Sequence, residues 1–77
     1  MTAKEMFNEI GFEFEITEYD EFKPDYNYIN KNDDVVYFDL EDKKLIFMPT
    51  NKQFIIRKPL KFIQAINKQI KELGWDD

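Results

Sequence analysis

The sequence contains no cysteine, no histidine and no serine. Without cysteine the chain forms neither a disulfide nor a zinc–thiolate site, which is compatible with a reducing compartment. The missing residues also exclude the nucleophile-and-base arrangements of serine and cysteine hydrolases. Two carboxylates alone can support a glycosidase, but that reaction needs a deep cleft, which a chain of 77 residues hardly encloses. We therefore expect a protein that is not an enzyme and has no cofactor.

Glycines and long apolar runs are also scarce. The two glycines, Gly11 and Gly74, both follow helical patterns, so neither belongs to a phosphate-binding loop. No apolar run approaches the roughly 20 residues of a membrane span. Glu5 and Glu9 stand where a signal peptide needs an apolar stretch. We expect a cytoplasmic protein that does not bind membranes.

The residues that are present predict one packed domain covering residues 1–77. Hydrophobic residues make up 43% of the chain and aromatic residues 17%, which is enough for a core. The net charge of −5 is unevenly distributed, because residues 1–42 hold thirteen acids and three bases, whereas residues 43–77 hold eight bases and three acids. Such a chain can neutralise itself on folding, pair head-to-tail with a copy, or present two faces to two partners.

Two segments have the pattern of amphipathic helices. Thr2 and Glu5 have the spacing of a capping box, and the helix that they begin runs from Ala3 to about Ile10, before Gly11. The second helix begins with Pro59 in its first turn and ends at Gly74 in a Schellman motif that folds Trp75 back toward the helix. Its apolar residues recur at helical spacing: Leu60, Ile63, Ile66, Ile70 and Leu73.

The segment between the helices has the pattern of strands. Phe12, Phe14 and Ile16 alternate with Glu13, Glu15 and Thr17, which predicts a strand with a buried apolar face and carboxylates in water. Further strands are predicted over residues 26–30, 35–40 and 45–48, with residues 54–57 open between strand and irregular structure. In the third hairpin we expect Leu40 to pair with Leu45 and Glu41 to oppose Lys44. The fold class is therefore α+β: an antiparallel sheet of about four strands (three to five), with the N-terminal and C-terminal helices packed on one face.

The two ends of the chain, TAKEMFNEIGF and LKFIQAINKQIKELGW, resemble small uncharacterised proteins of phages and prophages in low-GC Gram-positive bacteria. The resemblance covers about a third of the chain. It implies a phage or prophage origin and the cytoplasm of a bacterial host, and it implies no activity and no functional residue.

The first candidate site is an acidic patch in the N-terminal half, consisting of Glu13, Glu15, Glu18, Asp20 and Glu21. With Glu5 and Glu9 these acids place seven carboxylates within seventeen residues, with no base between them. Such a patch can imitate the phosphates of a nucleic acid and bind a basic groove in a salt-dependent way. Alternatively, the acids are simply the solvated face of a strand, where charged side chains discourage pairing with strands of other molecules.

Two further surfaces are candidates for binding. A basic stripe on the last helix, formed by Lys58, Lys61, Lys68 and Lys71, can lie along phosphates or can simply be its solvated side. An apolar set is expected on the sheet face away from the helices: Tyr26, Tyr28, Tyr37, Ile46, Met48 and Ile55. Exposed apolar patches of this kind commonly mark protein interfaces.

The pattern of a calcium loop occurs once but is incomplete. Asn30, Asn32, Asp34 and Glu41 fall on positions 1, 3, 5 and 12 of such a loop, but Val35 stands where a glycine must make the sharp turn. The stretch therefore predicts a plain hairpin turn and no metal site. We expect a non-enzymatic accessory protein that binds another protein or a second copy of itself. The alternative is a nucleic-acid-linked regulator that acts through the basic stripe or as an acidic decoy.

Overall fold

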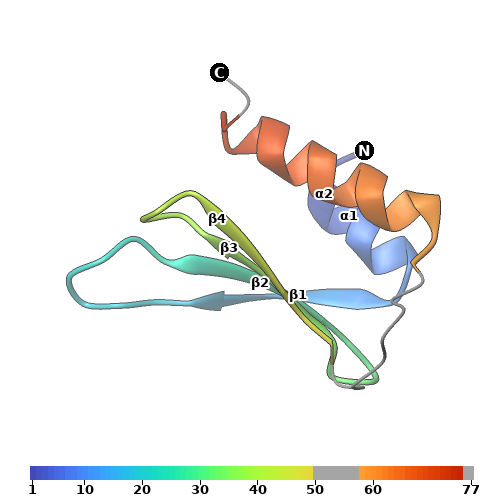
Figure 1. Cartoon of the computed structure of the whole chain (residues 1–77), viewed down its shortest axis with the longest axis horizontal. Helices are drawn as coiled ribbons and strands as arrows, with labels where there is room; N and C mark the ends of the chain where they lie inside the picture. Colours follow the sequence, from blue (N-terminus) through green and yellow to red (C-terminus); the bar gives the residue numbers. More distant parts are fainter. Residues whose placement is uncertain (50–57, 76–77) are drawn as a thin grey trace.

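A computed structural model of the chain describes residues 1–49 and 58–75. Its elements follow the order α1 (Ala3–Glu9), β1 (Phe12–Thr17), β2 (Asp25–Asn30), β3 (Val35–Asp39), β4 (Lys44–Met48) and α2 (Leu60–Glu72). Both helices lie on the same side of the sheet (Figure 1). The predicted α+β class, with a four-stranded antiparallel sheet and one helix at each end, is confirmed. The segment 54–57, including Ile55, lies outside the described residues.

The sheet has two faces of different composition, which its register defines. The strands pair antiparallel in the order β1-β2-β3-β4, and residues directly opposite one another share a face. The face beneath the helices, here called the helix face, includes one row across all four strands: Phe14, Tyr28, Val36 and Phe47. The opposite face, here called the open face, includes the rows Glu13, Ile29, Val35 and Met48; Glu15, Asn27, Tyr37 and Ile46; and Thr17, Asp25, Asp39 and Lys44.

The core lies between the helix face and the two helices, and aromatic rings fill much of it. The Phe7 ring of α1 stacks on Tyr28 with centroids 3.9 Å apart, and its edge contacts involve Phe12, Phe38 and Phe62. These five rings are buried. Stacked and edge-to-face pairs each contribute about 0.5–1.5 kcal/mol beyond the burial of their area. A small chain thereby gains core stability without a disulfide.

Local signals at the start of α1 form as predicted. The Thr2 hydroxyl accepts from the Glu5 amide at 3.2 Å, and the Glu5 carboxylate accepts from the Thr2 amide at 2.8 Å. The hydrogen bond from the Thr2 backbone holds the pKa of Glu5 below its ordinary value. The amide of Ala3 donates to Glu72 at 2.8 Å, so α2 supplies an acceptor for the first turn of α1. The two ends of the chain are thus tied together.

The C-terminal end of α2 is the predicted Schellman motif. Gly74 has a positive φ of 74°, its amide donates to the Lys71 carbonyl, and the Trp75 amide donates to the Ile70 carbonyl at 3.0 Å. The Trp75 ring returns to the sheet and lies 6.1 Å from the Phe38 ring. Pro59 is the N-cap residue of α2, one position before the helical position predicted for it.

The predicted apolar stripe of α2 is partly wrong in its rotation about the helix axis. Ile66 is buried and Ile70 and Leu73 pack against the core, as predicted, whereas Leu60 is 70% exposed and Ile63 49% exposed. Phe62, Ala65 and Gln69, which were not in the predicted stripe, are buried. Phe62 decides the rotation because its ring reaches Phe12 at 5.6 Å and Phe47 at 5.5 Å. α2 has 13 residues. No helix in residues 1–49 and 58–75 combines the length and apolar character that crossing a membrane requires.

The register of the β3–β4 hairpin differs from the predicted one by two residues. Leu45 pairs with Phe38, and Lys44 pairs with Asp39 where Glu41 was expected. The Asp39 carboxylate accepts from the amides of Glu41 and Asp42, which starts the turn earlier than predicted. A shift of two positions leaves every side chain on its predicted face, because strand side chains alternate with a period of two.

Candidate functional site

The predicted apolar set on the open face is partly wrong. Tyr28 and Tyr26 lie on the helix face, opposite Phe14 and Ile16 of β1, so they do not belong to that set. Tyr28 is 1% exposed, and Tyr26 packs edge-on against Phe14 with centroids 5.2 Å apart. The physical reason is that a tyrosine ring has an apolar body and a polar tip, so an alternation of tyrosine with asparagine does not reveal which face is buried.

A polar residue of α2 accepts a hydrogen bond from the hydroxyl of the buried Tyr28. The Tyr28 hydroxyl donates to the side-chain carbonyl of Gln69, which is itself buried in the helix–sheet interface. Burial and then the negative charge of Glu72 raise the pKa of Tyr28 well above its ordinary value. The hydroxyl therefore remains a hydrogen-bond donor at neutral pH. This pair belongs to the core and offers no binding group to solvent.

Three other members of the predicted set, Tyr37, Ile46 and Met48, do lie on the open face, and two neighbours join them. The resulting open-face patch consists of Ile29, Val35, Tyr37, Ile46 and Met48. Ile46 is 44% exposed and Met48 55% exposed, whereas the other three side chains are half-buried. Neither helix covers this face (Figure 1). The patch is therefore contiguous apolar surface on β2, β3 and β4.

The predicted acidic patch divides between two places. Glu13 and Glu15 are exposed on the open face of β1, as the alternation predicted. Glu18, Asp20 and Glu21 are exposed in the connection between β1 and β2, which projects beyond the end of the sheet that the helices do not cover (Figure 1). The five acids thus form no single cluster, and only the first two border the open-face patch.

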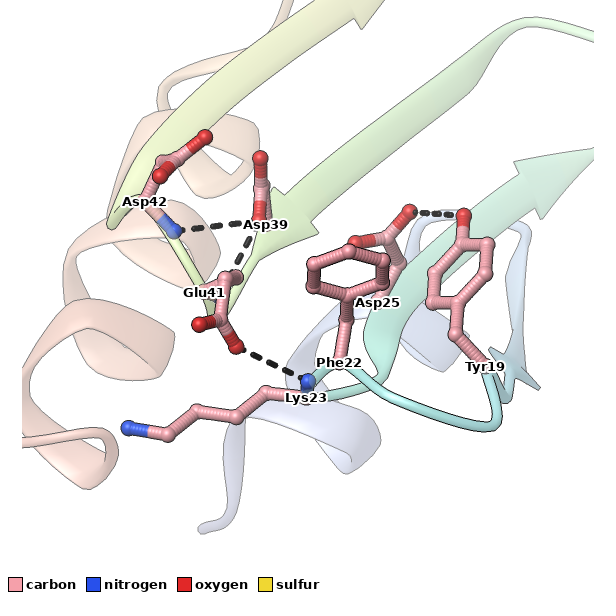
Figure 2. A pocket seen from close by; sticks show the side chains of 7 residues that line it. All are labelled: Tyr19, Phe22, Lys23, Asp25, Asp39, Glu41 and Asp42. Atoms are coloured by element: carbon pink, nitrogen blue, oxygen red, sulfur yellow. Dashed lines mark hydrogen bonds between the residues drawn. The ribbon is translucent and has the colours of Figure 1, made fainter.

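A hollow that the sequence did not reveal lies at this projecting end (Figure 2). Its volume is about 350 Å³, and it lies between the β1–β2 connection and the β3–β4 turn. The residues that line it are Tyr19, Phe22, Lys23, Asp25, Asp39, Glu41 and Asp42. We call it the acidic hollow, because four carboxylates and two exposed aromatic rings face it with a single lysine.

Hydrogen bonds fix the geometry of the acidic hollow. The Tyr19 hydroxyl donates to Asp25 at 2.8 Å, and the Lys23 amide donates to Glu41 at 2.9 Å, which ties the two turns together (Figure 2). The hydrogen bond to Asp25 raises the pKa of Tyr19, and the charge of Asp39 adds to the effect. Among the described residues, no ion pair joins the four carboxylates to a basic side chain. The hollow therefore carries net negative charge, with four carboxylates and one lysine in its lining.

The acidic hollow is missed by sequence analysis because its residues come from two separate turns. Both turns were expected, around Lys23–Asp25 and Glu41–Lys44, but each alone contains only a few surface acids. An antiparallel meander places alternate turns at the same end of the sheet, so the β1–β2 and β3–β4 turns become neighbours. The strand order would have been the signal that brings these acids together.

The predicted basic stripe loses one member. Lys58 forms an ion pair with Asp34 at 3.2 Å, its side chain is only 21% exposed, and its ammonium lies over the ring of Phe47 at 5.4 Å. It therefore supports the start of α2 and does not face a ligand. Lys61 and Lys71 are exposed and Lys68 is half-buried, so three lysines remain on the helix.

The first three calcium-loop positions, Asn30, Asn32 and Asp34, lie at the hairpin turn between β2 and β3, as predicted, whereas Glu41 lies in the β3–β4 turn. The Asn30 side chain accepts from the amides of Asn32 and Asp34 and donates to the Asp34 carboxylate at 3.0 Å. Asp33 occupies the left-handed region with φ 63°. Within the part of the chain that the structure describes, no group of three or more acidic residues has a geometry that could hold a metal ion.

The described surface thus offers an apolar patch with acidic surroundings. Comparison of the chain with protein-family models, curated proteins and solved structures finds no match.

Proposed function

We propose that this protein is a non-enzymatic accessory protein that acts by binding another protein through the open-face patch. The resemblance of its two ends to small phage and prophage proteins supports a role in the cytoplasm of a bacterial host. The absence of histidine, cysteine and serine from the sequence supports binding over catalysis.

The observation that carries the proposal is the exposure of Ile46 and Met48 beside Ile29, Val35 and Tyr37 on a face without helices. Single exposed apolar side chains are ordinary, but a contiguous set rimmed by polar residues marks interaction sites. Aromatic residues and methionine are enriched at protein interfaces, and the patch contains both. Burying the patch against a partner removes apolar surface from water, and this hydrophobic contribution favours binding.

The test is affinity capture from a lysate of a low-GC Gram-positive bacterium with a pair of matched variants. The double variant Ile46→Gln, Met48→Gln removes the exposed part of the patch. The control, Leu60→Gln with Ile63→Gln, removes two exposed apolar side chains from α2. We expect the first variant to lose a captured protein that the wild type and the control retain. If the control loses it equally, or the first variant keeps it, the open-face patch is not the binding site.

A second copy of the chain is one partner that the same proposal covers. Light scattering at high micromolar concentration distinguishes it, because a homodimer through the open-face patch doubles the mass of the wild type. The Ile46→Gln, Met48→Gln variant would then be a monomer. A monomeric wild type removes the homodimer while leaving binding to a different protein in place.

A second candidate function is a nucleic-acid-linked one, and the acidic hollow with Glu13 and Glu15 favours its decoy form. A decoy that imitates phosphates binds a basic groove through charge, so raised salt releases it. The apolar contacts of an interaction through the open-face patch persist at high salt. The other form of this function is direct binding of nucleic acid through the lysines of α2: Lys61, Lys68 and Lys71. A fluorescence anisotropy titration of duplex DNA with the protein at low salt tests it, and a flat curve excludes direct binding.

A further inference from the structure

The open face is apolar in its middle and acidic along two of its borders. On the β1 border, Glu13 and Glu15 lie beside Ile29 and Asn27 in the register of the sheet. At the end of the strands, Asp25 and Asp39 are paired with each other, one row beyond the row of Tyr37. The open-face patch therefore passes directly into acidic surface on two sides, with no intervening basic row.

The acidic hollow continues this surface around the end of the sheet. Asp25 and Asp39 belong both to the last row of the open face and to the lining of the hollow. Tyr19 curves back so that its hydroxyl binds Asp25 (Figure 2). The exposed ring of Phe22 lies beside it. Patch and hollow thus form one continuous surface in which apolar side chains lead into a carboxylate-rich, aromatic-walled depression.

Charges of the opposite sign are few on this surface. Six carboxylates lie on the open face and in the acidic hollow: Glu13, Glu15, Asp25, Asp39, Glu41 and Asp42. The lysines there are Lys44, which is paired in register with Asp39, Lys23 at the acidic hollow, and Lys31, which lines a shallow hollow with Glu13, Glu15 and Ile29. The other described lysines lie on the helices, in turns or, as Lys58, in the ion pair with Asp34.

We propose that the partner of the open face is a basic amphipathic segment of another protein. This inference rests on the proposed function and adds the chemistry of the partner. Apolar side chains of the segment cover the open-face patch, and a lysine or arginine enters the acidic hollow. There carboxylates accept its hydrogen bonds, and the faces of Tyr19 and Phe22 attract its charge. Further basic side chains lie over Glu13 and Glu15.

The same charges weigh against the other occupants of this surface. In a second copy stacked on this face, each acidic border would meet a surface that carries six acids and three lysines. Like charges across an interface cost free energy and suppress association. A nucleic acid would bring phosphates to the same carboxylates and would be repelled. A basic segment is the occupant for which both the apolar middle and the acidic borders are favourable.

The test uses two synthetic amphipathic helical peptides with identical apolar residues, one with lysine and arginine on its polar side and one with glutamate. Binding to the full chain is followed by the methyl NMR signals of Ile29, Val35, Ile46 and Met48. Leu60 and Ile63, exposed on α2, report nonspecific contact. We expect the basic peptide to shift the four open-face residues and leave the two helix residues unchanged, and we expect the acidic peptide to shift none.

A charge variant tests whether basic-peptide binding depends on the carboxylates of the acidic hollow or only on the net negative charge of the protein. The double variant Glu41→Gln, Asp42→Asn removes two charges from the acidic hollow, and the glutamine retains an acceptor for the Lys23 amide. Because exposed charge pairs contribute only modestly to binding, we expect basic-peptide affinity to fall about three- to tenfold at low salt. The matched control, Glu9→Gln with Asp33→Asn, removes two exposed acids elsewhere and should leave the affinity unchanged.

The outcomes separate this inference from the proposed function. If the acidic peptide shifts the open-face methyls as strongly as the basic one, the face binds proteins and the inferred charge of the partner is wrong. If the control variant weakens binding as much as the hollow variant, the acidic hollow is not the cation site and the inference fails. If the basic peptide shifts none of the open-face methyls, or if duplex DNA or a second copy of the chain shifts them instead, the inference is overturned.

Discussion

The two faces of the sheet are built by the same strands, and both carry apolar side chains, yet they have different roles. On the helix face, Tyr28 and Phe38 are buried against Phe7 of α1. On the open face, Ile46 and Met48 remain exposed with no helix above them. The helix face therefore contributes to stability, whereas the open face contributes surface for a partner. This difference predicts that substitutions of similar chemistry have very different effects on the two faces.

The largest expected effect is that of Phe7→Ala, because Phe7 contacts four other rings of the core. Truncating a buried phenylalanine costs about 3–5 kcal/mol, and a chain of this size has only ~4–11 kcal/mol of stability in total. We expect a much lower urea midpoint or an unfolded chain by circular dichroism. The matched control is Phe22→Ala, since Phe22 is 62% exposed. Comparable losses in the two variants would contradict the described core.

The second expected effect is that of Tyr28→Phe, which leaves the buried carbonyl of Gln69 without its donor. An unsatisfied buried polar group costs about 1–3 kcal/mol, so the urea midpoint should fall clearly. Adding Gln69→Leu removes the orphaned group and should restore part of the loss. Tyr37→Phe on the open face provides the comparison, with little expected change. A Tyr37 variant that loses as much stability as the Tyr28 variant would reverse the assignment of the two faces.

The same pair predicts an alkaline dependence of stability. Folding raises the pKa of Tyr28 above its ordinary value of 10.0, since burial disfavours the ionised phenolate. The free energy of unfolding is therefore unaffected by this group below pH 10.0, and it falls as the pH rises further, because the unfolded chain releases the proton first. Thermal melts across this range should show a steeper decline for the wild type than for Tyr28→Phe. Parallel declines would contradict the burial of the hydroxyl.

A smaller effect is expected at the end of α2 for Gly74→Val. Gly74 has φ 74°, and a Cβ at this position meets no atom within 4 Å, so the expected cost comes from backbone conformation. A β-branched residue in the left-handed region costs roughly 1–2 kcal/mol. Gly74→Asn should lose less, because asparagine tolerates that region better. The measurement is the melting temperature of each variant, and equal values for valine and glycine would argue against the Schellman ending.

The features that sequence analysis predicted correctly depend on residues close together in the chain. The capping box at Thr2 and the stop at Gly74 involve partners within five positions, so their chemistry is visible in the sequence itself. The alternation of Phe12, Glu13 and Phe14 likewise states which side chains share a face. The predicted register of the β3–β4 hairpin was wrong by two residues, but the predicted face of each side chain was still correct, because a shift of two preserves the alternation.

The features that sequence analysis missed depend on tertiary packing. Tyr28 and Asn27 lie on opposite faces and are both buried, and only the pairing of Tyr28 with Phe14 settles which of them lies beneath the helices. The rotation of α2 follows from the fit of the Phe62 ring among Phe12 and Phe47, which no helical periodicity encodes. The acidic hollow requires the order of the strands. In each case the missing information is which surfaces meet.

The smallest expected change in stability is that of Ile46→Gln with Met48→Gln on the open face, and it sharpens the comparison most. Because both side chains are about half exposed, the free energy of unfolding should change by no more than about 0.5 kcal/mol per substitution. The same variant should lose the partner in capture experiments, whereas a destabilised core variant loses it only by unfolding. The measurements are urea midpoint and capture on one preparation. A large fall in the midpoint would mean that these side chains already pack within the chain, and the open-face patch would then not be a free surface.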